Sequence, residues 1–340
     1  DIHGWSFLGG KGGDINYESL EFARLYHIWN NYFNDVDTNN LTEKEKSEFE
    51  EYKKLRNEYN KEQFYLKMQI DGGQELFEYI DKVKKEYGQF NKKTNKSYKP
   101  SSKEEKRMRR GLKMALMFID AEELQKEFSS AIEMFETSYK MNKNPKPDSL
   151  RKAIVGDNPE DPNEKYYGCN RYEGPDAMHG THVAGIIAAS HNDIGIKGVA
   201  KKVKIMALRA VPNGDERDKD IANAIIYAVD NGAQIINMSF GKYFTRNKAV
   251  VDKAIRYADS KGVLLVHAAG NDAKNTDNED IFPTQVTEDG EKANNWIQVG
   301  ASSSSKKKKK IIARFSNYGS NTVDLFAPGV NIYSTVPDNK

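Results

Sequence analysis

Short apolar runs alternate with stretches of helical spacing between residues 203 and 271 of the chain. The runs "VKIMALRAV", "QIINM" and "VLLVHAA" are each typical of a buried strand, and the stretches between them repeat apolar residues every three or four positions. Ile221, Ala224 and Ile225 share one helix face in this way, and Gly232 follows as a natural stop. Strands that alternate with helices form parallel sheets covered on both faces. The sequence therefore predicts an α/β fold with a doubly wound parallel sheet.

The N-terminal part of the chain has a different rhythm. Residues 14–142 are dominated by Lys, Glu, Asn and aromatic residues at helical spacing. Thr42 precedes Glu45 by three positions, and Ser102 precedes Glu105 by the same spacing, a pattern typical of a capping box at a helix start. We predict three or more long helices here, packed as a hairpin or small bundle. Residues 143–175, rich in Pro, Asn and Gly, are predicted to form a connecting loop region.

Charge and composition exclude several classes of partner and fold. Lys and Arg number 52 against 50 Asp and Glu, so the formal charge of +2 gives no electrostatic reason to expect nucleic acid or an anionic membrane as the main partner. No apolar run approaches the ~20 residues that span a bilayer. Cys169 is the single cysteine, which rules out an internal disulfide. The lysine-rich stretch at 302–310 is predicted to be a solvated surface loop rather than an anion-binding patch.

Polar residues follow two of the predicted strands directly. Ser239, Phe240 and Gly241 come after "QIINM", and Asn271 comes after "VLLVHAAG". In a parallel sheet these positions share the carboxyl edge, where functional groups gather. An asparagine on a glycine turn can aim its amide N–H at a developing oxyanion. A simple turn residue is the competing interpretation of Asn271, and the position alone leaves both open.

The stretch "DAMHGTHVAGIIAAS" places His179 and His182 three residues apart. A metal pair is one hypothesis, but the glutamate of HExxH is absent and no third ligand stands out. Burial in the core with a hydrogen bond is a second, and it suits His182; the small residues Thr181, Gly185 and Ala189 predict a close neighbour and a largely buried helix. A catalytic base is a third, because the positive end of the helix dipole favours neutral imidazole at His179.

Taken together, five motifs in this order resemble the subtilisin-like serine proteases, the subtilases. They are "HGTHVAGIIAA", "INMSFG", "VLLVHAAGN", "FSNYG" and "VDLFAPGVNIYST", and the resemblance covers about residues 176–338 and the opening "DIHGW". It implies a subtilisin-like α/β fold with a large, mostly helical insertion. Residues 1–13 would begin the subtilase core and 14–142 would be the insertion. Residues 143–175 would connect back to 176–340, the part of the core with the His and oxyanion Asn segments.

The resemblance also implies roles for individual residues. His179 would be the general base and acid, and Asn271 the side-chain donor to the oxyanion, while His182 would be structural. The segment 239–241 would pair with the substrate backbone. The pocket for the residue before the scissile bond would be lined by Ala268, Ala269 and Gly270.

Further expectations concern cofactors, partners and location. No metal or cofactor is expected in the reaction. The stretch "SHNDIGIKGVA" looks like the family's calcium loop, with Asn192 as a side-chain ligand, and the other ligands of that site would lie upstream of Asp1. Proteins or peptides are the expected substrates, and a secreted or cell-envelope location is the family expectation.

One departure from the family pattern matters for activity. A subtilase triad runs Asp, His, Ser along the chain, and neither the Asp motif before "DIHGW" nor the Ser motif after "APGVNIYST" occurs here. Asp176 is too close to His179 in sequence to replace that Asp, and Ser316 and Ser334 belong to non-catalytic motifs. We therefore expect a piece of a serine endopeptidase that works through an acyl-enzyme, itself inactive and poorly stable alone.

Two alternatives stay open at this point. The chain could belong to a non-catalytic subtilase-like binding module that holds an unidentified partner with the helical insertion. It could also belong to a metal-dependent hydrolase that uses His179 and His182.

Overall fold

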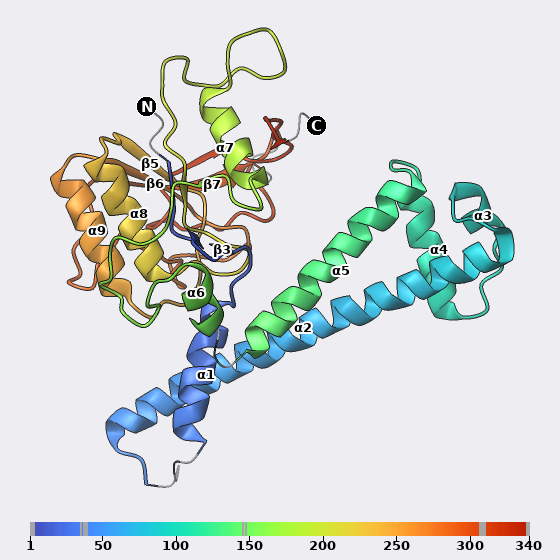
Figure 1. Cartoon of the computed structure of the whole chain (residues 1–340), viewed down its shortest axis with the longest axis horizontal. Coiled ribbons are helices and arrows are strands. Elements are labelled where there is room, and N and C mark those ends of the chain that lie inside the picture. The colour runs from blue at the N-terminus through green and yellow to red at the C-terminus, as the bar shows by residue number, and fades with distance from the viewer. Residues whose placement is uncertain are drawn as a thin grey trace. The chain divides into compact units, whose positions relative to one another are not determined.

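A computed structural model of the 340-residue chain describes residues 4–34, 36, 40–144, 146, 148–305 and 311–337. The chain divides into two compact units. Unit 1 comprises Asp1–Leu25 and Lys146–Lys340, and unit 2 comprises Tyr26–Pro145. Figure 1 shows strands in unit 1 and long helices in unit 2.

The elements of unit 1 follow the predicted alternation of strands and helices. Its strands are β1 (Trp5–Ser6), β2 (Gly9–Gly10), β3 (Gly13–Asp14), β4 (Leu208–Arg209), β5 (Ile235–Met238), β6 (Leu264–Ala268), β7 (Trp296–Ser302) and β8 (Leu325–Pro328). Its helices are α6 (Asp148–Ile154), α7 (Met178–Ala188), α8 (Asp218–Asp230) and α9 (Lys248–Ser260). Helix α1 (Glu21–Phe33) begins in unit 1 and continues into unit 2.

A four-stranded parallel sheet with the order β5-β6-β7-β8 forms the centre of unit 1. In its register Met238 lies opposite His267, and Ala268 lies opposite Val299. The connections between these parallel strands run through α9 and through longer loops. The prediction of an α/β fold with a parallel sheet is confirmed.

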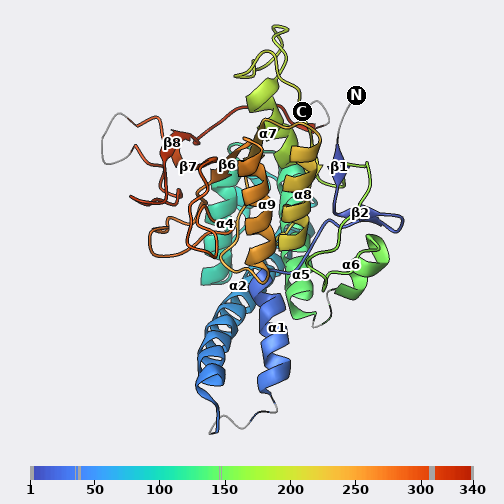
Figure 2. The same ribbon diagram turned by 90° about the vertical axis from the view of Figure 1, so that its left-hand side faces the viewer.

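Helices α8 and α9 pack side by side and cover one face of this sheet (Figure 2). Ile225 of α8 and Ile255 of α9 join Leu265 and Trp296 of the strands in one apolar core. Alternation of side chains along each strand puts its other residues on the opposite face. That face is only partly covered in the described residues, and Ile235 is 63% exposed there.

The apolar run at 203–211 forms much less strand than its sequence predicts. Only β4 is in a ladder, and it pairs in parallel with β1 as a separate two-stranded sheet. Val203 and Ile205 are exposed rather than buried. The prediction of one continuous buried strand is therefore wrong. A strand paired on one side has fewer neighbours to bury its side chains, whatever its sequence favours.

Two regions that the sequence predicts as loops also contain regular backbone pairing or a helix. Residues 143–175 contain the short helix α6, whose Arg151 is fully buried, so this stretch is more than a connecting loop. At the stretch 302–310, Ser302 forms an antiparallel bridge with Ile312. Lysines 306–310 lie outside the described residues.

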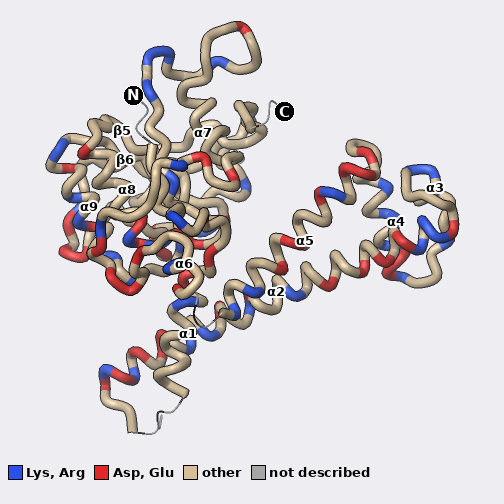
Figure 3. Tube along the Cα trace, viewed as in Figure 1, with Lys and Arg blue, Asp and Glu red and all other residues tan. Residues whose placement is uncertain are grey.

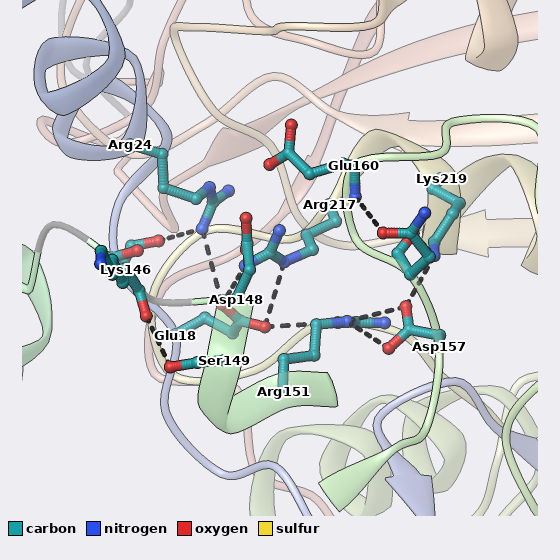
Figure 4. A network of polar contacts seen from close by, with 12 residues as sticks. Glu18, Arg24, Lys146, Asp148, Ser149, Arg151, Asp157, Glu160, Arg217 and Lys219 are labelled. Carbon is teal, nitrogen blue, oxygen red and sulfur yellow. Dashed lines mark hydrogen bonds and ion pairs between the residues drawn. The ribbon is translucent and has the colours of Figure 1, made fainter. Parts of the chain in front are cut away.

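Arg151 is the centre of a buried network of ion pairs in unit 1 (Figure 4). Its guanidinium donates to both carboxylate oxygens of Asp220 at 2.8 Å and to Asp157 at 3.0 Å, and it pairs with Glu18 at 3.3 Å. Tyr167 donates its hydroxyl proton to Asp220 at 2.6 Å. The arginine thus joins three carboxylates from segments far apart in the sequence.

Further pairs extend this network. Arg217 pairs with Glu18 at 3.0 Å, and Lys219 pairs with Asp157 at 2.6 Å. Burial raises the pKa of Glu18, but the neighbouring arginines outweigh it and hold the pKa below its usual range. Such a network needs every member, because a buried charge left without a partner is costly.

Unit 2 consists of helices with apolar contacts between them. Its helices, besides the rest of α1, are α2 (Glu43–Tyr87), α3 (Lys92–Ser97), α4 (Lys103–Ala115) and α5 (Ala121–Lys143). The predicted capping box at Thr42 and Glu45 is present, and α2 ends at Gly88 with a left-handed φ of 76°. Ser102 caps α4 as predicted, but the Glu105 carboxylate accepts from the N–H of Ser101 instead of Ser102.

Helices α2 and α5 pack against each other along unit 2. Gly73, in the middle of α2, permits close approach, since a Cβ there would lie 2.4 Å from Ile132 of α5. The far end holds a core of Tyr79, Ile80 and Leu112 with other buried residues. Although α2 has 45 residues, none of the helices in the described ranges is both long and apolar enough to span a bilayer.

Replacing Arg151 with Met should lower the free energy of unfolding of unit 1 by about 3–5 kcal/mol, because Asp157, Asp220 and Glu18 would lose a buried partner. Urea unfolding in a Trp29→Phe background measures this, since the remaining tryptophans, Trp5 and Trp296, lie in unit 1.

The matched control is Lys197→Met, which removes the exposed pair with Asp193 in the same unit. That pair should contribute ~0.5 kcal/mol or less. Equal, small losses in the two variants would show that the buried network does not hold unit 1 together.

Candidate functional site

The parallel register of β5 and β6 brings two predicted substrate segments together. Met238, the last residue of β5, lies opposite His267. Ser239, Phe240 and Gly241 therefore leave the sheet beside Ala268–Asn271, at the same carboxyl edge. The Phe240 and His267 rings confirm the contact, with centroids 6.1 Å apart. The sequence prediction that these segments share one edge is met by the strand pairing.

Two glycines allow the segments to approach the Ile281 side chain. A Cβ on Gly241 or on Gly270 would lie 2.8 Å from a carbon of Ile281. Gly270 also has a φ of +98°, a backbone conformation that residues with a Cβ rarely adopt. A Cβ there would lie 2.4 Å from Nδ2 of Asn317. Glycine is thus required immediately before Asn271 for both backbone and packing reasons.

The side chain of Asn317 holds the loop after β6 in place. Its Oδ1 accepts hydrogen bonds from the N–H groups of Asp272 at 3.0 Å and Lys274 at 2.9 Å. Its Nδ2 donates to the carbonyl of Ala269 at 2.8 Å and to the hydroxyl of Tyr243 at 2.9 Å. Asn317 is fully buried, and its four bonds use the full capacity of the amide. They fix the backbone on both sides of Asn271.

Asn271 lies at the surface of this fixed loop. Ala269 is buried, Gly270 is half-buried, and Asn271 is exposed. An amide carried on a backbone held from both sides can present its N–H to a ligand without reorganising. The arrangement can therefore stabilise a negative oxygen at the carboxyl edge of the sheet.

A second polar network lies beneath the same loop. His267 Nδ1 is 3.0 Å from Oε1 of Gln298, which also accepts from the indole N–H of Trp296 at 3.0 Å. Since that oxygen only accepts, His267 must donate from Nδ1. Nε2 of Gln298 donates a long bond of 3.4 Å to the Ala268 carbonyl. Burial lowers the pKa of His267 to about 4, so the ring is neutral at pH 7.

His179 lies in the first turn of α7 and is exposed. Helix α7 packs on the chain that follows β8, where Ser334 donates to the His182 carbonyl at 2.6 Å and Thr335 donates to the Thr181 carbonyl at 2.9 Å. A Cβ on Gly185 would lie 2.1 Å from Thr335. The helix is thus attached to the segment that leaves the carboxyl edge of the sheet. No hydrogen bond joins His179 to Asn271 in the described residues.

The sequence overestimates the burial of α7. Gly185 is the buried residue of this helix, and its close neighbour is the segment that contains Ser334 and Thr335. His182 is half-buried and lies 3.3 Å from the Ile332 carbonyl, so it has the expected hydrogen bond without core burial. Small residues permit close approach, but they do not by themselves cover a helix.

The residues around Asn192 bond to one another, and calcium at this loop stays a prediction. The Asn192 side-chain oxygen accepts from the N–H of Ile194 at 3.2 Å, and the Asp193 carboxylate pairs with Lys197 at 2.7 Å. Calcium needs six to eight oxygen ligands. No group of three or more His, Cys, Asp or Glu in the described ranges is placed to hold a metal, at this loop or at His179 and His182.

Residues 144–340, more than half of the chain, match the family model described as the subtilase family of S8 peptidases. The chain belongs to the subtilase family. Its strand-edge loop with Asn271 lies within the matched region.

Named relatives agree with this assignment. A thermophilic serine proteinase from Bacillus sp. (strain AK1) is 43% identical over 48% of this chain and 37% of the relative. Thermitase from Thermoactinomyces vulgaris is 39% identical over 47% of this chain and 52% of the relative. The subtilase chain thus spans about a third to a half of the length of the curated relatives it matches.

A solved cold-adapted subtilisin-like serine proteinase is 31% identical over 47% of this chain and 51% of its own, with a TM-score of 0.37. At that score the structural likeness adds nothing to the family assignment.

Sequence analysis missed the residues that support the loop. Asn317 lies in "FSNYG", which helped identify the family, but nothing in that stretch indicates that its amide reaches the loop after β6. His267 did leave a signal, because a histidine within an apolar strand needs a buried partner. Its partner Gln298 lies two strand positions after Trp296, on the same face.

Replacing Asn317 with Ala should lower the free energy of unfolding by about 3 kcal/mol, since it leaves the N–H groups of Asp272 and Lys274 without their acceptor and the buried Ala269 carbonyl without its donor. Hydrogen exchange at these two amides should accelerate. Asn321→Ala, at an exposed position nearby, should change stability by ~0.5 kcal/mol or less. Unchanged exchange at both amides in Asn317→Ala would contradict the supporting role.

The low pKa of His267 predicts an acid-sensitive fold. The unfolded histidine binds a proton near pH 6.5 and the folded one near pH 4, so this group's contribution, about 3 kcal/mol, is present above pH 6.5 and lost as the pH falls to 4. In His267→Gln the free energy of unfolding should change less between pH 7 and 4 than in the parent chain. Parallel pH profiles of the two chains would contradict a neutral buried imidazole.

Proposed function

We propose that the protein carrying this chain is a serine endopeptidase that hydrolyses peptide bonds through an acyl-enzyme. The observation that carries the proposal is the loop after β6, in which Asn317 fixes the backbone around the exposed Asn271. Membership of the subtilase family supports it.

In the proposed reaction, His179 takes the proton of a serine hydroxyl as its oxygen attacks the peptide carbonyl. The carbonyl oxygen becomes an anion and accepts a hydrogen bond from Asn271. His179 then gives its proton to the leaving amine, and water later hydrolyses the acyl-enzyme with the same histidine as base. Ser239–Gly241 pair with the substrate backbone, and Ala268–Gly270 line the pocket for the residue before the scissile bond.

The triad partners of His179 come, in this proposal, from outside the 340 residues. No serine or aspartate in the described part of the chain hydrogen-bonds to its ring. An exposed histidine with neither an orienting carboxylate nor a nucleophile does not turn over peptide. We therefore propose that the 340-residue chain alone is inactive and that its flanking sequence completes the site.

Substrates and location follow the family in this proposal. Proteins or peptides are the substrate class, in keeping with relatives named as serine proteinases. A secreted or cell-envelope location is proposed with them. A metal-dependent hydrolase is not supported, because the described residues offer His179 and His182 no third ligand.

The test uses the protein with its flanking sequence and a fluorophosphonate probe, which labels an activated serine. His179→Ala should abolish labelling, because the serine loses its base. Asn271→Ala should lower turnover by about 10²–10³-fold, the loss known for such a donor in a subtilase, with a smaller change in KM.

His191→Gln is the matched control, since His191 is also exposed and bonds the Gly198 carbonyl outside the proposed site. It should label normally. Undiminished labelling of His179→Ala would contradict the base role. An unlabelled parent protein would favour a non-catalytic binding module that uses the helical insertion.

A further inference from the structure

The outer face of α4 in unit 2 carries a row of basic side chains. Lys103, Lys106, Arg107, Arg110 and Lys113 recur at helical spacing and are all exposed. The opposite side of α4 is fixed by packing, because Leu112 and Leu116 belong to the unit 2 core. Arg109 turns inward and donates to the Tyr98 carbonyl at 3.1 Å. Folding therefore determines which face is presented.

This face belongs to a strongly basic part of a nearly neutral chain. Residues 91–118 contain ten Lys and Arg against two Glu, a net charge of +8, while the whole chain carries +2. Figure 3 shows this concentration of Lys and Arg on α3 and α4. Of the two acids, Glu105 is buried and paired with Lys82 at 3.0 Å. The overall charge thus conceals one local anion-attracting region.

Apolar side chains protrude where this basic face ends. Met114 lies on the same face as Arg107 and Arg110 and is 58% exposed. Met117 and Phe118 follow in the turn after α4 and are 54% and 88% exposed. Transfer of apolar side chains of this size out of water lowers the free energy, and the fold of unit 2 does not bury them.

Acidic groups limit how far the face extends. Asp120, Glu122 and Glu123 begin α5 and are exposed. The Asp120 carboxylate accepts from the N–H groups of Glu122 and Glu123, so it is engaged at the helix start. The basic face is therefore bounded on the α5 side, and contact runs along α4 to Phe118.

We propose that the outer face of α4, with Met114, Met117 and Phe118, docks on an anionic lipid surface. Lysines and arginines contact the lipid phosphates, and the three apolar side chains enter the boundary between head groups and acyl chains. A nucleic acid or an acidic protein would satisfy the positive charge. A lipid surface also accepts protruding apolar groups at any position, without a matching pocket. The inference does not depend on protease activity.

The experiment measures binding of the 340-residue chain to vesicles by co-sedimentation. Binding to phosphatidylcholine vesicles that contain phosphatidylserine is expected, with little binding to pure phosphatidylcholine and release by added salt. A triple Gln variant at Lys106, Arg107 and Arg110 should bind about a hundredfold more weakly. A triple Ser variant at Met114, Met117 and Phe118 should bind more weakly by at least about tenfold.

The matched control replaces Lys201, Lys202 and Lys204, exposed lysines of unit 1, with Gln. It removes the same charge and should bind within about twofold of the parent chain. Equal losses in the control and the α4 variant would overturn the proposal. Absence of binding to anionic vesicles would do so too, as would tighter binding to duplex DNA or polyglutamate with no effect of the triple Ser change. Circular dichroism verifies that each variant is folded.

Discussion

The parallel register of β5 and β6 is the constraint on which the candidate site depends. Pairing of Met238 with His267 makes both strands end at one edge, so the segments that follow them must leave side by side. A slip of one residue would turn every side chain to the other face and separate Phe240 from His267. The helices α8 and α9 resist such a slip, because their apolar faces fit only the buried set of strand residues.

Polar groups then fix the loop that the register positions. Asn317 forms hydrogen bonds to the backbone between residues 269 and 274. Gln298 forms hydrogen bonds to His267 and to the Ala268 carbonyl. The Asn317 amide is buried and fully bonded, which makes it a rigid support rather than a liability. The ion pairs around Arg151 act differently, since they tie the N-terminal segment, α6 and α8 together through charge. Unit 1 is therefore held by an apolar sheet core and by a buried ionic network.

The sequence predicted what depends on local pattern. The strand and helix alternation, the cap at Thr42 and the shared edge of residues 239–241 and 268–271 all follow from spacing and turn chemistry. The long-range polar partners could not be predicted in this way. Asn317 and Arg151 bond to groups far away in the sequence, which periodicity does not indicate. Burial was overestimated at 203–211 and along α7, since burial depends on the neighbours and not on apolar content alone. The domain division at 14–142 stays a prediction beside the observed units.

The most direct test is a crystal structure of the protein with its flanking sequence, bound to a peptidyl phosphonate that mimics the tetrahedral intermediate. The account predicts that the phosphonyl oxygen accepts a hydrogen bond from the Asn271 side chain, with the His179 ring in hydrogen-bond reach of the modified serine. The peptide should pair with Ser239–Gly241. An adduct remote from Asn271, or His179 on another face of the molecule, would contradict the proposed protease site.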